Sequence, residues 1–318
     1  MRAEPGACRM LVADICIALV VVAIFGLNFV AIKIALVAFP PLFLTGLRFL
    51  LAAFPGVLIL KPPRTSVRIV VAFGLCLGVV KFGLLFLGMA LGMPAGLSSL
   101  VLQTQVFFTI GLAFLVFGER PSRLQLLSAL IAGCGVGVIA VWQGQHALLG
   151  PFLLVIGAAL FWGVANVVVK AAGRIDMLAL MVWGSLVAAP PLLALSLVVE
   201  GPDAITSAVQ KADAWSWSAV LFIAYPTTML AFALWNRLLS RYPAVTVTPF
   251  ALLIPIIGLS SSRWLLDEPF EIADAAGAAL IFFGIALNVL VAWLRQRRAG
   301  DTRPASIITT ALRDHPAP

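Results

Sequence analysis

The side chain with the clearest chemical consequence is a lysine in the middle of an apolar run, Lys81, within residues 78–83. An ammonium group at the centre of a bilayer is costly unless it faces a cavity or a partner. Asp14 lies near the start of the first apolar run, and no run carries an Asp or Glu at the depth of Lys81. We therefore interpret Lys81 as a binding group for a substrate carboxylate; a snorkelling or backbone-bonded lysine is the alternative.

Three amides and one indole could complete a polar site around this lysine. Asn28 and Asn166 occupy related places in the two halves of the chain, where an amide pair could bind an amino-acid ligand or bond helix to helix. Gln103 is the polar candidate on its run, and Trp162 could wall a cavity or belong to an interfacial aromatic belt. The predicted substrate-binding residues are therefore Lys81, Gln103, Asn28, Asn166 and Trp162.

The positions of the other charged residues in or beside the apolar runs indicate structural roles. Arg48 lies inside a run but closer to its end, so we interpret it as a tie to helix-end carbonyls or a snorkelling anchor. Glu119 and Glu268 stand at the ends of runs. We expect them to cap helices or pair with nearby arginines rather than to bind substrate.

Enzyme chemistry finds no support in the residue pattern. The only histidines are His146 and His315, and no Ser–His–Asp set, metal-ligand cluster or phosphate-binding glycine loop is present. We therefore predict no catalytic residue, no cofactor and no bound metal. The cysteines lack Cys-x-x-Cys spacing and are interpreted as small apolar residues: Cys8, Cys16, Cys76 and Cys134.

Composition places the chain in a bilayer. Of its 318 residues 62% are hydrophobic and 11% charged, with a mean hydropathy of +1.11, whereas a soluble domain is about 25% charged. The net charge of +8 does not indicate nucleic-acid binding, because the basic residues lie in short loops and a tail. Ten apolar runs predict an all-α integral membrane protein: 11–32, 42–60, 67–91, 95–117, 124–142, 150–171, 177–199, 216–238, 245–266 and 273–294.

Basic residues predict the topology. With the N-terminus in the cytoplasm of an inner-membrane protein, sixteen lysines and arginines are cytoplasmic and three, Lys33, Lys211 and Arg263, are external. Both termini are then cytoplasmic, and residues 200–215 form the one long external loop. The sixteen are Arg2, Arg9, Lys61, Arg64, Arg68, Arg120, Arg123, Lys170, Arg174, Arg237, Arg241, Arg295, Arg297, Arg298, Arg303 and Arg313.

An internal repeat divides the chain. Glu119 and Glu268 are 149 residues apart, and a glycine precedes a lysine by seven residues both at Lys33 and at Lys170. Five spans per half force the halves to face opposite ways, an arrangement typical of transporters with a central site. We predict a first repeat at 11–142, a second at 150–294, and a disordered, basic cytoplasmic tail at 295–318.

The chain resembles the EamA family of the drug/metabolite transporter superfamily over roughly residues 11 to 295. The resemblance rests on these motifs: Gly26-Leu27-Asn28-Phe29 with Lys33, Pro40-Pro41 with Gly46-Leu47-Arg48-Phe49, Gly118-Glu119-Arg120, Trp162-Gly163 with Asn166, and Leu266-Asp267-Glu268. It implies ten-helix exporters made of two inverted five-helix repeats. Residues 92–97, 99–103, 107–110 and 252–255 are similar to family members that export O-acetylserine and cysteine, in which an amide stands at the place of Lys81.

These observations predict an inner-membrane exporter of small metabolites, with amino acids and derivatives such as cysteine and O-acetylserine as substrates. It would work by alternating exposure of one central cavity. A broad exporter of drugs or cations is the alternative, which Lys81 opposes because it repels cations. A non-transporting membrane scaffold is the alternative from another class. The expected partners are the lipid bilayer, a small-molecule substrate and, as an open possibility, a second copy in a homodimer.

Overall fold

The computed structural model describes residues 10–145, 148–173 and 175–301, and these residues are helical apart from short connections. Ten helices in this part of the chain are long and apolar enough to cross a membrane. They confirm the prediction of an all-α bundle of ten spans. The spans are Val12–Ala38, Pro41–Ile59, Val67–Ala90, Ala95–Phe117, Arg123–Gln145, Leu149–Ala172, Met177–Val199, Ala214–Arg241, Thr248–Leu266 and Ile272–Leu294.

The first five spans contain both regular and irregular helix. Span 1 is α1 (Val12–Ala38), span 2 combines α2 (Pro41–Ala53) with α3 (Gly56–Ile59), and span 5 is α8 (Arg123–Gln145). Span 3 runs through α4 (Val67–Phe73), a π-helical segment η1 (Gly74–Phe82) and α5 (Gly83–Ala90). Span 4 runs through α6 (Ala95–Val101), a 3-10 segment η2 (Leu102–Thr104) and α7 (Gln105–Phe117).

The last five spans repeat this pattern. Spans 6, 7 and 10 are α9 (Leu149–Ala172), α10 (Met177–Val199) and α16 (Ile272–Asp301). Span 8 runs through α12 (Ala214–Phe222), a π-helical segment η3 (Ile223–Ala231) and α13 (Phe232–Arg241). The ninth comprises a 3-10 segment η4 (Thr248–Leu252) and α15 (Leu253–Leu266), preceded by α14 (Ala244–Val247).

The irregular segments recur at the spacing that the two glutamates predict. Each residue of η3 lies 149 positions after its counterpart in η1. Left-handed backbone ends α7 at Gly118, with φ 69°, and ends α15 at Asp267, with φ 52°, again 149 positions later. The backbone geometry thus repeats at the same spacing as the charged residues.

Packing between the halves has the reciprocity of a two-fold repeat. The segment η1 packs on α9 and α10, and η3 packs on α1 and α2, which are the corresponding spans of the other half. Gln103 of η2 donates from Nε2 to the backbone oxygen of Ala251 in η4 at 3.4 Å, so the two 3-10 segments also meet. The repeats therefore join along their irregular segments, where a transporter site is expected.

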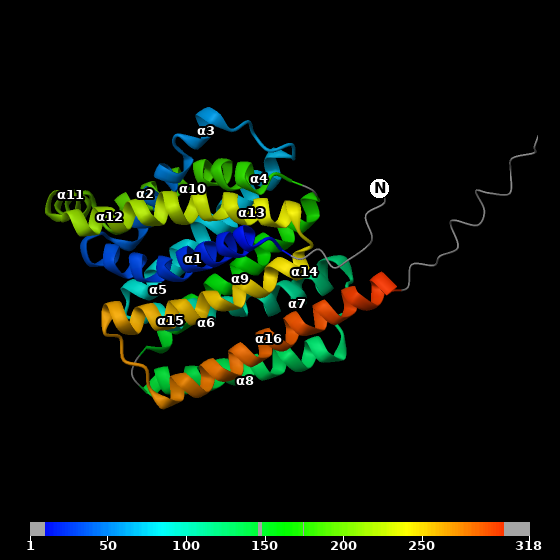
Figure 1. Ribbon diagram of the computed structural model, residues 1–318. Helices are drawn as coiled ribbons and strands as arrows, with labels where there is room; N and C mark the ends of the chain where they lie inside the picture. The colour runs from blue at the N-terminus through cyan, green and yellow to red at the C-terminus, as the bar shows by residue number, and fades with distance from the viewer. Residues whose placement is uncertain (1–9, 146–147, 174, 302–318) are drawn as a thin grey trace, which may run out of the picture.

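Glycines permit close approaches between helices of the bundle. A Cβ built on Gly258 of α15 would lie 2.3 Å from Oγ of Ser99 in α6, and one on Gly277 of α16 would lie 2.4 Å from Cγ1 of Ile139 in α8. Small residues at membrane helix contacts allow this packing. Figure 1 shows α8 and α16 side by side along one edge of the bundle.

Three details differ from the sequence-based expectation. The first span continues beyond residue 32 to Ala38, which places Lys33 inside the helix. Residues 200–215 are not an irregular loop, because an amphipathic helix, α11 (Pro202–Lys211), occupies most of this connection. The last span extends as α16 to Asp301, and the remainder of the predicted tail lies outside the described residues.

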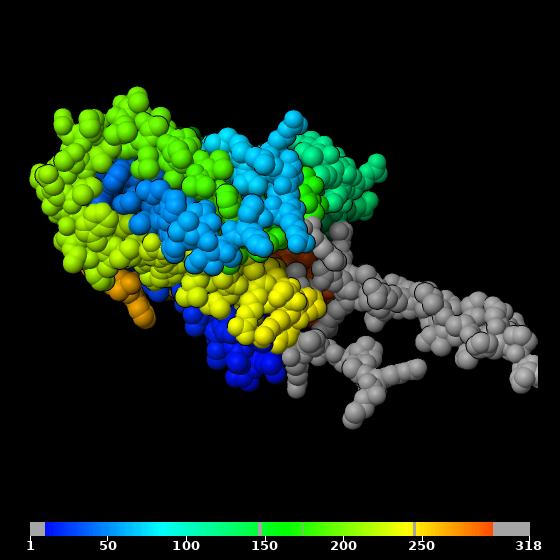
Figure 2. Space-filling model, turned by 90° about the horizontal axis from the view of Figure 1, so that it is seen from above, coloured from blue at the N-terminus to red at the C-terminus, as the bar shows by residue number. Residues whose placement is uncertain are grey.

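The outer faces of the spans carry aliphatic side chains, as contact with lipid requires. Figure 2 shows one such face, with α2–α4 in blue and cyan, α10–α12 in green and α13 in yellow. Large aliphatic residues are exposed on several of these helices: Leu58, Ile59, Val67, Leu197 and Val198.

Candidate functional site: two buried cations around Phe82

Lys81 lies near the end of the π-helical segment η1 and is buried, with 3% of its surface exposed. Its Nζ lies 3.3 Å from the ring centroid of Phe82 and 4.5 Å from that of Trp162 in α9. Within the described residues Lys81 forms no hydrogen bond and no ion pair. The ammonium group is thus held by aromatic faces, which attract a cation but do not neutralise its charge.

A second cation lies on the same ring. Arg48 of α2 is 1% exposed, and its Cζ lies 4.2 Å from the Phe82 centroid. Its Nε and Nη2 both donate to Oγ1 of Thr228 in η3, at 3.2 and 3.1 Å. Its Nη1 is buried without a hydrogen-bond partner. Arg48 is therefore neither snorkelling nor bound to helix-end carbonyls, so the sequence-based interpretation of this residue is wrong.

The two cations are close, and no carboxylate of the described residues pairs with either of them. Both distances end at the Phe82 centroid, so Arg48 and Lys81 are separated by no more than the sum of 4.2 and 3.3 Å. The acidic residues of the described chain lie at span ends or in connections; Asp14, for example, accepts a hydrogen bond from the Tyr242 hydroxyl at 2.7 Å. Two like charges in a low-dielectric interior favour an anion between or beside them.

Trp162 is the predicted site residue that the structure places directly against Lys81. Asn28 on α1 is 6% exposed, and its Oδ1 is buried without a donor. Because a buried carbonyl oxygen without a donor is costly, Asn28 offers an unused acceptor inside the bundle. The helix that carries it packs on η3, the segment that contains Thr228.

The other two predicted site residues have protein partners in this conformation. Nδ2 of Asn166 donates to Oε1 of Gln105 at 2.7 Å and to Oγ1 of Thr109 at 3.0 Å, which joins α9 to α7. Gln103 is 9% exposed and donates to Ala251 across the two repeats. These contacts fit the helix-to-helix role for both amides, and their contact with substrate stays a prediction.

Sequence reasoning overlooked two parts of the site, Phe82 and Thr228. An aromatic ring directly after Lys81 was a usable signal, because rings adjacent to a buried cation are common partners. Thr228 carried no comparable signal, since it is 180 residues from Arg48 and meets it only through the packing of η3 on α2.

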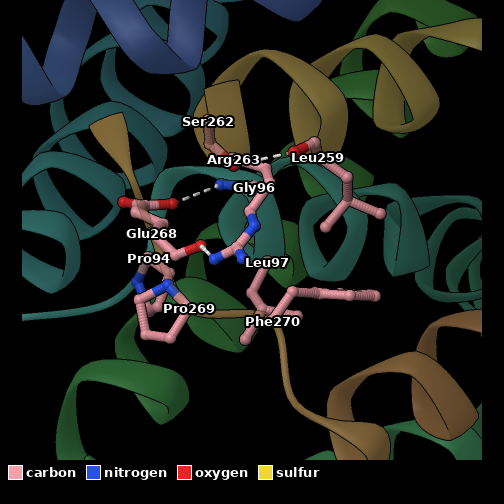
Figure 3. Close-up of a pocket in the computed structure, with 9 residues that line it drawn as sticks. All are labelled: Pro94, Gly96, Leu97, Leu259, Ser262, Arg263, Glu268, Pro269 and Phe270. Carbon is pink, nitrogen blue, oxygen red and sulfur yellow. Dashed lines mark hydrogen bonds between the residues drawn. The ribbon is translucent and has the colours of Figure 1, made fainter. Parts of the chain in front are cut away.

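One end of the bundle is closed around Glu268. Its Oε1 accepts a hydrogen bond from the backbone N–H of Ala95 at 2.8 Å, and its Oε2 accepts one from that of Gly96 at 3.2 Å. Glu268 therefore caps α6, which confirms the helix-capping role predicted for it. Figure 3 shows the carboxylate directed at Gly96, with Arg263 donating to the Glu268 backbone oxygen. The space left between these residues is a cavity of about 10 Å³.

Glu119, which corresponds to Glu268 in the first repeat, follows the end of span 4, the span that begins with α6. Glu119 pairs with Lys170 at the end of α9, and both side chains are about half exposed, at 54% and 45%. The corresponding lysine of the first half, Lys33, instead donates to the backbone oxygen of Met89 at 2.8 Å. The two ends therefore hold related residues in different arrangements: Glu268 and Lys33 are partly buried and bind backbone groups, whereas Glu119 and Lys170 are exposed and pair with each other.

A bundle of ten spans in two inverted repeats, with two buried cations where the repeats meet, has the architecture of a membrane transporter rather than of an enzyme. The chain belongs to the EamA-like transporter family, whose model matches residues 13–141 and 149–290.

Comparison with known proteins supports this assignment. The chain is 40% identical over 279 residues to the "Probable amino-acid metabolite efflux pump" of Salmonella typhimurium, covering 86% of this chain and 93% of that protein. It is 36% identical over 289 residues to the protein of the same name from Escherichia coli, covering 89% and 96%. One solved structure shares the fold, with a TM-score of 0.56 and 19% identity over 88% of this chain and 97% of that one.

Proposed function

We propose that the protein exports amino acids and related small metabolites across the inner membrane, with Lys81 binding the substrate carboxylate. The observation that carries the proposal is the buried ammonium group without any acceptor. A buried charge needs compensation, and no protein group in the described chain supplies it. The names of the Salmonella and Escherichia relatives, amino-acid metabolite efflux pumps, support the substrate class.

An amino acid would satisfy two unused groups at once. Its carboxylate would accept from Nζ of Lys81, and its ammonium would donate to Oδ1 of Asn28. Trp162 would form one wall beside Lys81, and alternating access would expose the site first to the cytoplasm and then to the outside. Both termini face the cytoplasm in this proposal, which follows from the distribution of basic residues.

Efflux from proteoliposomes tests the proposal. Vesicles that contain the purified protein are loaded with labelled cysteine or serine, and the release of label is followed. We expect release by the wild type, and a loss of at least tenfold in the Lys81→Met variant. The Lys81→Gln variant, which keeps a donor for a carboxylate, should retain intermediate activity. Equal rates and affinities for wild type and Lys81→Met would remove Lys81 from the site.

The alternatives give different results in the same vesicles. Release of quaternary ammonium dyes but not of amino acids would favour a cation exporter, which two buried cations oppose. No release of any small solute would favour a scaffold. The proposed homodimer is tested separately, by the mass of the detergent-solubilised protein in light scattering.

A further inference from the structure

We infer that Arg48 is a second substrate-binding cation, so that the site takes acidic amino acids in preference to neutral ones. The inference rests on the proposed function and specifies its substrate class. It assigns the second carboxylate of aspartate or glutamate to the guanidinium of Arg48 and the first to Lys81. Neither the family nor the names of the relatives distinguish acidic from neutral amino acids.

The bonding of Arg48 is incomplete for a structural arginine. A guanidinium carries five N–H donors in a planar fork. In Arg48 the donors on Nε and Nη2 converge on a single hydroxyl oxygen, that of Thr228. Nη1 is buried and unbonded, although the side chain is 99% removed from solvent. Such a group is costly unless a ligand supplies an acceptor, and a carboxylate is the acceptor that matches the fork.

The aromatic ring that both cations contact sets the geometry of the site. Cζ of Arg48 lies 4.2 Å and Nζ of Lys81 lies 3.3 Å from the Phe82 ring centroid, so both charges contact one rigid group. Rings of Phe49 and Phe86 also lie within 6 Å of the guanidinium, at 5.7 and 5.9 Å. Apolar walls of this kind exclude water, and the repulsion between the two charges is then only weakly screened.

Charge balance decides between substrate classes. A neutral amino acid brings a carboxylate and an ammonium together, so it leaves the total charge at the cation pair unchanged. An acidic amino acid brings one further carboxylate and lowers that total by one unit. With no protein carboxylate at this depth in the described residues, the acidic ligand is the one that completes the pair.

Matched ligands test the inference on the unmodified protein. Aspartate and asparagine have nearly the same shape and differ by one charge, as do glutamate and glutamine. We would measure each affinity by titration of the detergent-solubilised protein, and transport by counterflow in proteoliposomes. The expected result is that aspartate binds at least about tenfold more tightly than asparagine, the effect of about 1.4 kcal/mol of added interaction. Equal affinities, or tighter binding of asparagine, would overturn the inference.

Two variants then locate the effect at Arg48. In Arg48→Gln the preference for aspartate over asparagine should fall to about threefold or less, while the affinity for asparagine changes little. Arg48→Lys is the matched control, because it keeps a positive charge at this position. It should keep the preference for aspartate. If Arg48→Gln does not fold, the ligand pairs on the wild type still decide the question.

Failure of this inference is distinguishable from failure of the proposed function. Counterflow of asparagine and glutamine without any advantage for their acidic counterparts would overturn the role of Arg48 and leave amino-acid export intact. An Arg48→Gln variant that binds aspartate and asparagine with the wild-type ratio would do the same. Absence of counterflow for all four amino acids would overturn the proposed function itself.

Discussion

Removal of the Glu268 carboxylate should open the closed end of the bundle. Glu268 accepts two backbone N–H groups at the start of α6, at 2.8 and 3.2 Å. The loop that carries it joins α15 to α16, so the contact ties two spans of the second half to a span of the first. A state that opens between α6 and α15 must break both hydrogen bonds. The carboxylate therefore stabilises the closed arrangement selectively.

The size of the effect follows from helix capping. Loss of a capping side chain costs about 0.5–2 kcal/mol. Because about 1.4 kcal/mol corresponds to a factor of ten, Glu268→Ala should raise the ratio of open to closed molecules by about 2-fold to 30-fold. Glu268→Gln retains one acceptor oxygen and should have a smaller effect.

Thiol labelling measures this population. Leu97 is 2% exposed and borders the small cavity beside Glu268, so a cysteine placed there reacts only when this end opens. In a background that lacks the native cysteines, a charged maleimide should label Leu97→Cys faster when Glu268→Ala is present. Glu119→Ala, at the repeat-related position, is the control that should not raise this rate. Equal labelling rates with and without Glu268→Ala, at unchanged melting temperature, would refute the reasoning.

Three further predictions concern topology, packing and pH. A reporter enzyme should be active on the cytoplasmic side when fused to the C-terminus and on the external side when inserted at His146; cytoplasmic activity at His146 would contradict the orientation. Gly258→Ala should lower the free energy of unfolding by about 1–3 kcal/mol, and with it the melting temperature, because its Cβ would meet Ser99 at 2.3 Å; an unchanged melting temperature would contradict this contact. Hydrogen bonding from Ser216, through its side chain and then its backbone N–H, holds the pKa of Asp213 below the ordinary value. This cap of α12 should therefore persist as the pH falls past that value and weaken only at the lowered pKa, which a carboxyl NMR titration would show; an ordinary midpoint would contradict it.

The spans were predictable because each satisfies a length requirement of the bilayer, about 20 apolar residues. The repeat was predictable because charged residues at span ends recur at a fixed spacing, as Glu119 and Glu268 do. Helix irregularity was only partly foreseeable. Pro226 and Pro249 interrupt hydrogen bonding in η3 and η4, whereas η1 contains no proline. The segment η1 packs against α9 and α10, and no local sequence pattern encodes these contacts between distant parts of the chain.

The candidate site was likewise predictable only in part. Lys81 could be singled out because a mid-span charge is rare and costly. Arg48 was misinterpreted because its depth was judged from distance along its own run. The packing of η3 against α2 brings it to Thr228, and the ring of Phe82 in η1 also lies against it. Contacts between residues 180 positions apart depend on tertiary packing, and one sequence cannot supply them.

The two halves share a backbone but differ in charge at the point where they meet. The position in η3 that corresponds to Lys81 is Leu230, and the one that corresponds to Phe82 is Ala231. The repeat thus provides the same π-helical irregularity twice, and only the first half places a cation and a ring at these two positions. A symmetric pair of segments can exchange their arrangements when the transporter opens to one side and then to the other. The buried ammonium of Lys81 therefore has no counterpart at the repeat-related position, so the two sides of the interface between the repeats differ in charge.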